Sequence, residues 1–218
     1  MPKVGRNERK NGGAMKLNAW AVVLTICWIG ALPVWAAAPM EELKGPIDQV
    51  VRILQDPKYQ DKSQSEAQRT ELMAVINGIF DFQEISKRTI GRRWKSFDQK
   101  QQREFQETFA DFLGYTYYQK VRDAYQGEKV VFLSQEVLEN GNAVVKTNIP
   151  RKQGQIPLDY RMINKKEGWR IYDVIIEGVS LVKNYRTQFN TILGKETPDQ
   201  LISRLKQKIQ EQKQGSSS

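Results

Sequence analysis

Two carboxylates beside an apolar segment are the residues of this chain best suited to acid–base chemistry. Asp173 lies inside the mostly apolar segment Trp169–Ile176, and Glu177 follows that segment directly. A carboxyl group in apolar surroundings has a raised pKa and can act as a general base. Tyr160 or Tyr172 could complete an acid–base pair of the kind that isomerases use. One hypothesis is therefore a small-molecule enzyme on a cone-shaped α+β scaffold, with Asp173 or Glu177 at its centre.

The same turn also has a structural interpretation. Glu177 stands just before Ser180, whose hydroxyl is suited to cap a helix. A carboxylate there can accept hydrogen bonds from free N–H groups at the helix start, or pair with Arg186. In that case the carboxylates serve the fold, and the protein is a binding protein or a structural adaptor without a ligand.

Several kinds of catalysis are excluded by composition. The 218 residues include no histidine and one cysteine, Cys27. Serine–histidine or cysteine–histidine nucleophiles, and zinc or copper sites built from histidine and cysteine, therefore lack their side chains. The chain also has no glycine-rich phosphate loop and no basic run interleaved with aromatic residues, so we expect no cofactor, no metal and no nucleic acid.

The N-terminal segment 1–36 is typical of a secretory signal. Basic residues precede an apolar run from Ala19 to Gly30, and the small residues Ala36–Ala38 follow. We predict cleavage near Ala37 and a periplasmic product, with translation starting at Met1 or Met15. An uncleaved anchor is the alternative, because 19–38 approaches the ~20 residues that span a bilayer. Cleavage would lower the formal charge from +9 to +5, because five basic residues and one acidic residue are lost.

The first half of the mature chain is expected to be helical. Asp56-Pro57 ends the first apolar stripe, and Gly91 offers a stop for the second. Ser96–Gln99 matches a capping box with Ser96 as the cap, and a long helix should begin there. The three stripes are Ile47, Val50, Val51, Leu54; then Leu72, Val75, Ile76, Ile79, Phe80 with Phe82, Ile85, Ile90; then Phe105, Phe109, Phe112, Leu113, Tyr117, Val121.

The second half changes to the two-residue period of strands. Asn140-Gly141, the region of Gly154, and Lys166–Gly168 supply short turns, which imply an antiparallel meander. A helix should follow at Ser180–Leu193, and another should start at Thr197-Pro198. The four expected strands are Val130–Leu138, Ala143–Ile149, Ile156–Ile163 and Trp169–Ile176. The fold class predicted is α+β: a curved antiparallel sheet of four strands, or slightly more, with a layer of helices on one face enclosing an apolar cavity.

Several short motifs occur at fixed spacings along the chain. They are IPLDY at 156–160, GWRIYDV at 168–174, IEGVSL at 176–181 and NYRTQF at 184–189, with FDF at 80–82, Ile90-Gly91 and Trp94 upstream. With these motifs, the chain resembles the MlaC family, periplasmic phospholipid-binding proteins also called toluene-tolerance or Ttg2-type proteins. The likeness runs from about Ile47 to Leu205, and it is specific because many fixed spacings agree together.

The resemblance implies a lipid carrier rather than an enzyme. Its ligand would be a glycerophospholipid, with the acyl chains in the cavity and the headgroup near solvent. Its partners would be an outer-membrane lipoprotein complex and an inner-membrane ABC transporter complex, and the carrier itself would be a monomer. We expect one lipid-binding domain at 37–211 and a disordered tail at 212–218.

The resemblance also implies which apolar side chains line the cavity, although periodicity alone is equally compatible with an ordinary core. The candidates are Ile79, Phe82, Ile90, Trp94, Phe105, Phe109, Phe112, Leu113, Tyr117, Val145, Ile149, Leu158, Tyr160, Met162, Trp169, Ile171, Ile175, Val179, Leu181, Tyr185 and Phe189.

Overall fold

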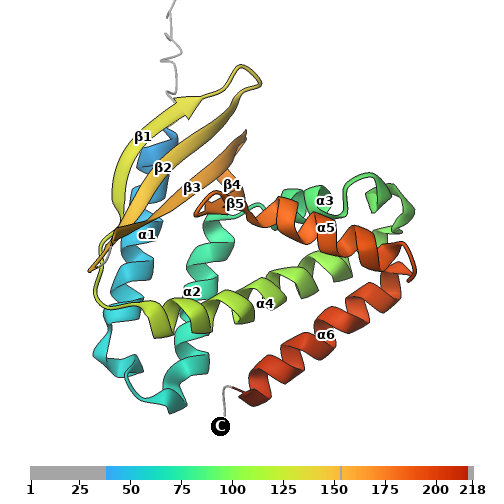
Figure 1. Ribbon diagram of the computed structural model, residues 1–218, viewed down its shortest axis with the longest axis horizontal. Helices are drawn as coiled ribbons and strands as arrows, with labels where there is room; N and C mark the ends of the chain where they lie inside the picture. The colour runs from blue at the N-terminus through green and yellow to red at the C-terminus, as the bar shows by residue number, and fades with distance from the viewer. Residues whose placement is uncertain (1–37, 153, 216–218) are drawn as a thin grey trace, which may run out of the picture. The chain divides into compact units, whose positions relative to one another are not determined.

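The computed structural model describes residues 38–152 and 154–215 (Figure 1). The predicted signal segment, with its cleavage site near Ala37, lies outside these residues. The helices are α1 (Pro39–Gln55), α2 (Ser65–Ile79), α3 (Phe82–Ile90), α4 (Gln99–Ala124), α5 (Leu181–Leu193) and α6 (Pro198–Gly215), with short 3-10 helices at Pro57–Tyr59, Lys62–Gln64 and Gly91–Ser96. The strands are β1 (Val131–Val137), β2 (Asn142–Arg151), β3 (Gly154–Lys165), β4 (Gly168–Ile176) and β5 (Val179–Ser180).

The sheet is the predicted antiparallel meander. Its strands follow the order β1-β2-β3-β4-β5, so each strand pairs with its neighbour in sequence. Asn140-Gly141 forms the predicted first turn, where Gly141 takes a φ of 76° that other residues rarely adopt. The α+β class is confirmed, and the short strand β5 makes the sheet slightly larger than the four strands expected.

Strand β1 forms one edge of the sheet and is irregular. The register with β2 shifts between Phe132 and Ser134, which leaves Leu133 as a bulge. Leu133 is 57% exposed, and the apolar side chains of Val131 and Val137 on the same strand are exposed too.

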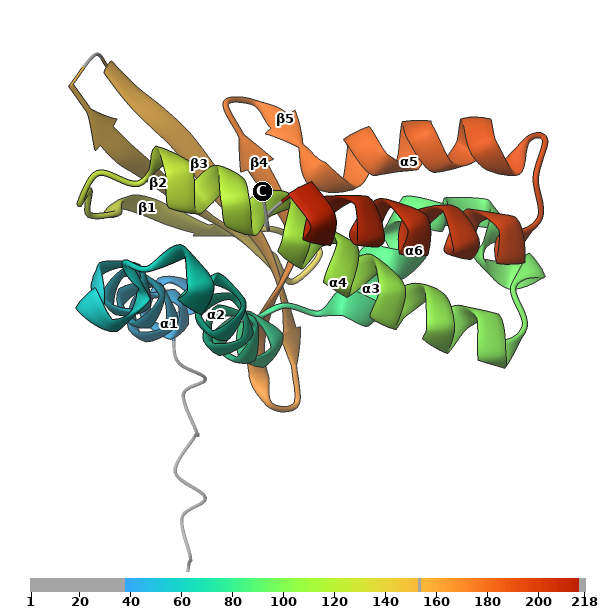
Figure 2. The ribbon, with the colours of Figure 1, turned by 90° about the horizontal axis from the view of Figure 1, so that it is seen from below.

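The helices form two groups. α1 and α2 lie against the sheet, where Leu43 of α1 and Ile79 of α2 pack with Val145, Met162 and Ile171 (Figure 1). The other group consists of α3, α5, α6 and the first part of α4, which share an aromatic-rich cluster (Figure 2). We call this set the aromatic cluster; its buried members are Ile85, Ile90, Phe97, Phe105, Phe109, Leu113, Val182, Tyr185, Phe189, Leu193, Leu201, Ile202 and Leu205.

The start of α4 differs from the sequence-based prediction. Asp98, rather than Ser96, is the cap: its Oδ1 accepts from the N–H of Gln101 at 2.8 Å, while Gln101 Oε1 accepts from the N–H of Asp98 at 3.0 Å. Asp98 and Gln101 are three positions apart, as are Ser96 and Gln99, so the capping-box pattern fits both pairs. The Ser96 hydroxyl does not cap α4, because it donates a hydrogen bond to the carbonyl of Arg93 in the preceding 3-10 turn.

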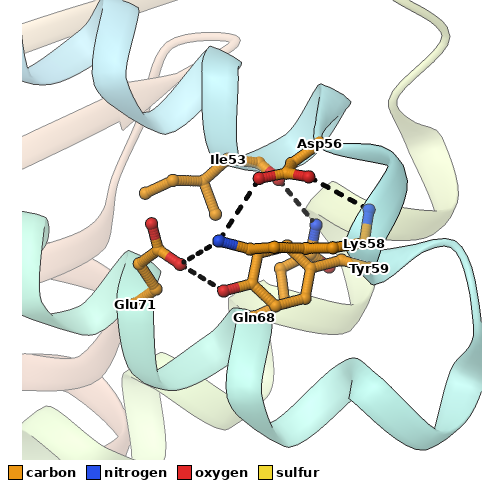
Figure 3. Close-up of polar contacts among 6 residues, drawn as sticks. All are labelled: Ile53, Asp56, Lys58, Tyr59, Gln68 and Glu71. Atoms are coloured by element: carbon orange, nitrogen blue, oxygen red, sulfur yellow. Dashed lines mark hydrogen bonds and ion pairs between the residues drawn. The ribbon is translucent and has the colours of Figure 1, made fainter.

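A polar corner joins α1 to α2 (Figure 3). Asp56 stops α1 as predicted, and its side chain accepts from the N–H of Lys58 at 3.0 Å. Lys58 Nζ lies 3.3 Å from Asp56 and 3.1 Å from Glu71 of α2. Below them, the buried Gln68 amide donates to the carbonyl of Ile53 at 2.9 Å. These contacts fix the direction in which α2 leaves α1.

At the C-terminus, α6 runs to Gly215, four residues beyond the domain boundary expected at 211. Gln212 donates its amide to the hydroxyl of Thr116 on α4 at 2.9 Å. The polar residues 212–215, which were expected to begin a disordered tail, therefore belong to the helix α6, which contacts α4.

The turn from β4 to α5 assigns a structural role to Asp173. Ser180 caps α5 as predicted and accepts from the N–H of Lys183 at 3.0 Å. Asp173, only 2% exposed, accepts from the N–H of Val182 at 3.0 Å and from the hydroxyl of Ser180 at 2.6 Å. The expectation that Glu177 does this is wrong. Glu177 is exposed and has a φ of 49°, so Asp173 on the buried strand is the carboxylate that reaches the helix start.

The expected pairing of Glu177 with Arg186 is also wrong. Arg186 Nε instead donates to the carbonyl of Arg88 at 2.6 Å and links α5 to α3. No ion pair joins Glu177 to Arg186 in the part of the chain that the structure describes.

Replacing Asp173 with alanine should destabilise the fold by about 2–4 kcal/mol. The substitution leaves the Val182 N–H and the Ser180 hydroxyl without their buried acceptor. Urea unfolding followed by circular dichroism measures this change in the free energy of unfolding.

Glu177→Gly is the matched control at the same turn. Glycine relieves the positive φ and no hydrogen bond is lost, so stability should stay level or rise by up to about 1 kcal/mol. Equal losses in both variants would contradict the role given to Asp173.

Candidate functional site: an apolar cavity

A cavity of about 640 Å³ lies between the sheet and the helices α1, α2 and α4. Its wall is mostly aliphatic. α1 contributes Pro46, Ile47, Val50, Val51 and Leu54; α2 contributes Leu72, Val75, Ile76 and Ile79; the sheet contributes Ile149, Ile156, Leu158, Tyr160, Ile171, Val174 and Ile176. Cavities of this size and character are typical of sites for apolar or amphipathic ligands.

The mouth of the cavity lies at the last turns of α4. Among its lining residues, the ones with exposed side chains are Lys120, Val121 and Ala124; all others are buried or half-buried. These three residues share one face of α4 near its C-terminal end. A ligand can therefore reach solvent between this end of α4 and the elements that face it.

The opposite end of the cavity, which we call the closed end, is lined by buried side chains. Leu113 of α4 and Ile85 of α3 line this end, and both belong to the aromatic cluster, with Phe80 and Phe82 packed against it. At about 1.5 Å per residue, the stretch of α4 from Leu113 to the exposed Ala124 is about 17 Å long. Within the described residues, the exposed lining side chains thus lie at one end of this apolar cavity, which we call the tunnel.

Apart from Lys120 at the mouth, the charged side chains in the wall have partners within the protein. Arg69 Nη2 donates to Glu66 at 2.6 Å, and this bond holds the pKa of Glu66 below its usual range. Arg151 donates to Glu128 and to the carbonyl of Ala124. The N–H of Gln126 and the Arg151 guanidinium hold the pKa of Glu128 low as well. The tunnel therefore presents little uncompensated charge to a ligand.

Tyr160 adds a neutral polar group to the wall. Burial raises the pKa of its phenol, so it stays protonated at any physiological pH. Asp173 also borders the cavity, but its oxygens already accept from Ser180 and Val182 and lie 3.5 Å from Arg161. These contacts favour a structural role for Asp173 over the general base considered from the sequence. Within residues 38–152 and 154–215, no cluster of acidic, histidine or cysteine side chains could hold a metal ion.

The predicted lining residues divide into two sets. The nine that border the cavity are Ile79, Phe82, Leu113, Tyr117, Ile149, Leu158, Tyr160, Ile171 and Leu181. The other twelve lie elsewhere. Seven belong to the aromatic cluster or pack on it: Ile90, Phe105, Phe109, Tyr185 and Phe189 are buried in it, and Trp94 and Phe112 pack against it. Three are buried where α1 and α2 meet the sheet, namely Val145, Met162 and Trp169, while Ile175 is half-buried and Val179 is exposed. Contact of any of these side chains with a ligand stays a prediction.

The candidate list omitted the wall formed by α1 and much of α2. The stripes containing Val50 and Val75 are evident in the sequence, and their period identifies them as inward-facing. The spacing of apolar residues shows which face of a helix is buried, but it does not show whether protein atoms or open volume lie beside that face. A signal did exist, since both stripes are aliphatic whereas the one on α4 is aromatic.

The fold and the tunnel together define an α+β protein with an apolar cavity between a curved sheet and helices. A family model described as MlaC protein matches residues 44–207, so the chain belongs to the MlaC family. The intermembrane phospholipid transport system binding protein MlaC of Haemophilus influenzae is 26% identical over 161 residues, which cover 72% of this chain and 71% of that relative.

A solved structure has the same fold. It is that of a phospholipid-binding protein from Ralstonia solanacearum in complex with a phospholipid. The two chains align with a TM-score of 0.71 at 22% identity, over 81% of this chain and 99% of the other.

Enlarging a side chain in the wall distinguishes a cavity from a packed core. Val50→Phe places a ring where the structure has open volume, so the free energy of unfolding should stay within about 1 kcal/mol or increase. Val145→Phe, at a fully buried position that does not border the cavity, should destabilise by about 1–3 kcal/mol. Chemical denaturation measures both, and similar losses would show that Val50 has no free space beside it.

Proposed function

We propose that this protein is a periplasmic phospholipid shuttle. It carries glycerophospholipid between an outer-membrane lipoprotein complex and an inner-membrane ABC transporter complex, and it performs no catalysis. The observation that carries the proposal is the apolar tunnel, whose exposed lining side chains lie at the end of α4.

The dimensions of the tunnel suit a membrane acyl chain. The hydrocarbon core of a bilayer is ~30 Å thick, so one chain reaches about 15 Å from its headgroup. The tunnel is about 17 Å long beside α4. The walls of this cavity are almost entirely apolar, so leaving them in contact with water carries a free-energy cost. Acyl chains remove that cost.

The relatives support a phospholipid as the ligand. The Haemophilus influenzae protein is named as the binding protein of an intermembrane phospholipid transport system, and the Ralstonia solanacearum structure holds a phospholipid. With the chains in the tunnel, the headgroup would lie at the mouth beside Lys120, whose side chain is exposed and forms no ion pair among the described residues.

Handover to a partner follows from the energetics of lipid release. Each buried methylene is worth about 0.8 kcal/mol, so a ~16-carbon chain would cost on the order of 12 kcal/mol to expose to water. Spontaneous release into water would be very slow. The carrier must therefore dock on a partner complex that offers apolar surface at the mouth.

No helix within the described residues is long and apolar enough to cross a membrane.

Purified mature protein should contain glycerophospholipid in near-stoichiometric amount. Native mass spectrometry followed by organic extraction measures the load and the number of acyl chains. Val50→Phe should lower the load without unfolding the protein, because its ring occupies the tunnel. A wild-type protein that stays free of lipid after incubation with phospholipid vesicles and the inner-membrane complex would contradict the proposal.

Transfer should depend on contact with a partner. With fluorescent phospholipid loaded on the protein, release to vesicles containing the inner-membrane complex should be at least ~10-fold faster than release to vesicles of lipid alone, since only the former supplies a docked acceptor. Equal rates would show that the partner complex is not needed.

A further inference from the structure

Two aromatic residues lie between the closed end of the tunnel and a second pocket. Phe80 and Phe82 line the tunnel, and both also line a second pocket of about 460 Å³ on the surface. The second pocket is polar, with Asp81, Gln106 and Lys165 among its lining residues. No other residue borders both spaces in the described part of the chain.

The two rings form a single stacked barrier. Their centroids are 5.8 Å apart with an interplanar angle of 19°. Phe80 packs against both the aromatic cluster and the sheet core, and Phe82 packs against the aromatic cluster. Both side chains are only half-buried, so the barrier between the apolar tunnel and the polar pocket is thin.

The backbone under the rings is held independently of them. The N–H of Phe80 donates to Ile76 at 2.9 Å, and the N–H of Asp81 donates to the carbonyl of Ile171 at 2.8 Å. The Asp81 carboxylate accepts from the N–H of Glu84 at 2.8 Å and pairs with Lys165 at 2.8 Å. Removing one ring therefore leaves the segment between α2 and α3 in place.

We propose that the Phe80–Phe82 pair is the end stop that sets the longest acyl chain the protein carries. This inference rests on the proposed lipid cargo. A terminal methyl group that enters at the α4 mouth and passes along the ~17 Å of α4 between Ala124 and Leu113 reaches the end of the tunnel that these rings line, and this length matches a chain of membrane length. A longer chain meets the stacked rings, and its surplus methylenes stay exposed at the mouth. Removing a ring opens the tunnel into the second pocket and gives those methylenes room.

The test compares Phe82→Ala with Phe112→Ala. Phe112 is a half-buried ring packed on the same aromatic cluster, but it borders neither pocket, so its removal deletes the same atoms without opening the barrier. Each protein is incubated with vesicles that contain equal amounts of dipalmitoleoyl, dioleoyl and dieicosenoyl phosphatidylglycerol. Native mass spectrometry then gives the total lipid load and the chain-length distribution.

Phe82→Ala should shift the bound lipid toward eicosenoyl chains, by about fourfold for each additional methylene that becomes buried. Phe112→Ala should keep the wild-type distribution. If Phe82→Ala unfolds, Phe82→Leu keeps an apolar side chain at the same place and should give a smaller shift in the same direction.

Two other outcomes are distinguishable. A normal lipid load with the same distribution in all variants overturns the end stop and leaves the proposed function standing. A wild-type protein that takes up none of the lipids contradicts the proposed function and the end stop together.

Discussion

Hydrophobic collapse would close a 640 Å³ cavity with aliphatic walls unless contacts outside the cavity kept those walls apart. The aromatic cluster provides such contacts at the closed end, where Phe189 packs edge to face on Phe105 and Phe109 at centroid distances of 5.6 and 5.1 Å. Since α3, α4, α5 and α6 share this cluster, it fixes the position of Leu113 and thus of the α4 wall. These rings were predicted to line the cavity; instead, they hold in place the helices that carry the lining residues.

The other end depends on a buried amide. Gln68 of α2 is 2% exposed; it donates to the carbonyl of Ile53 on α1 at 2.9 Å and accepts from the Tyr118 hydroxyl of α4 at 2.9 Å. One side chain thus links the three helical walls of the tunnel. Because a buried amide loses free energy if its hydrogen bonds break, this link opposes any sliding of α1 or α2 that would narrow the tunnel. Apolar packing alone is non-directional and would not fix that geometry.

The sequence predicted most of the fold, because the two-residue and 3.6-residue periods are local properties. It predicted the meander, the stop at Asp56, and the caps of α5 and α6, where Thr197 and Gln200 exchange hydrogen bonds. It placed the α4 cap two residues early, because the chain offers the same pattern at Ser96 and Asp98. The cavity lining was predicted less well. Period cannot distinguish Phe109, which faces other rings, from Val50, which faces open volume, since that difference depends on how far apart the helices are held.

The bulge at Leu133 bears on whether the sheet can pair with a second copy of the chain. β1 presents an unpaired sheet edge with three exposed apolar side chains, and such edges are templates for pairing with a second chain. The shifted register interrupts the regular row of N–H and C=O groups halfway along β1 and increases its twist. A second copy could therefore align with only a few residues on either side of Leu133. This one-residue irregularity therefore opposes aggregation through the β1 edge.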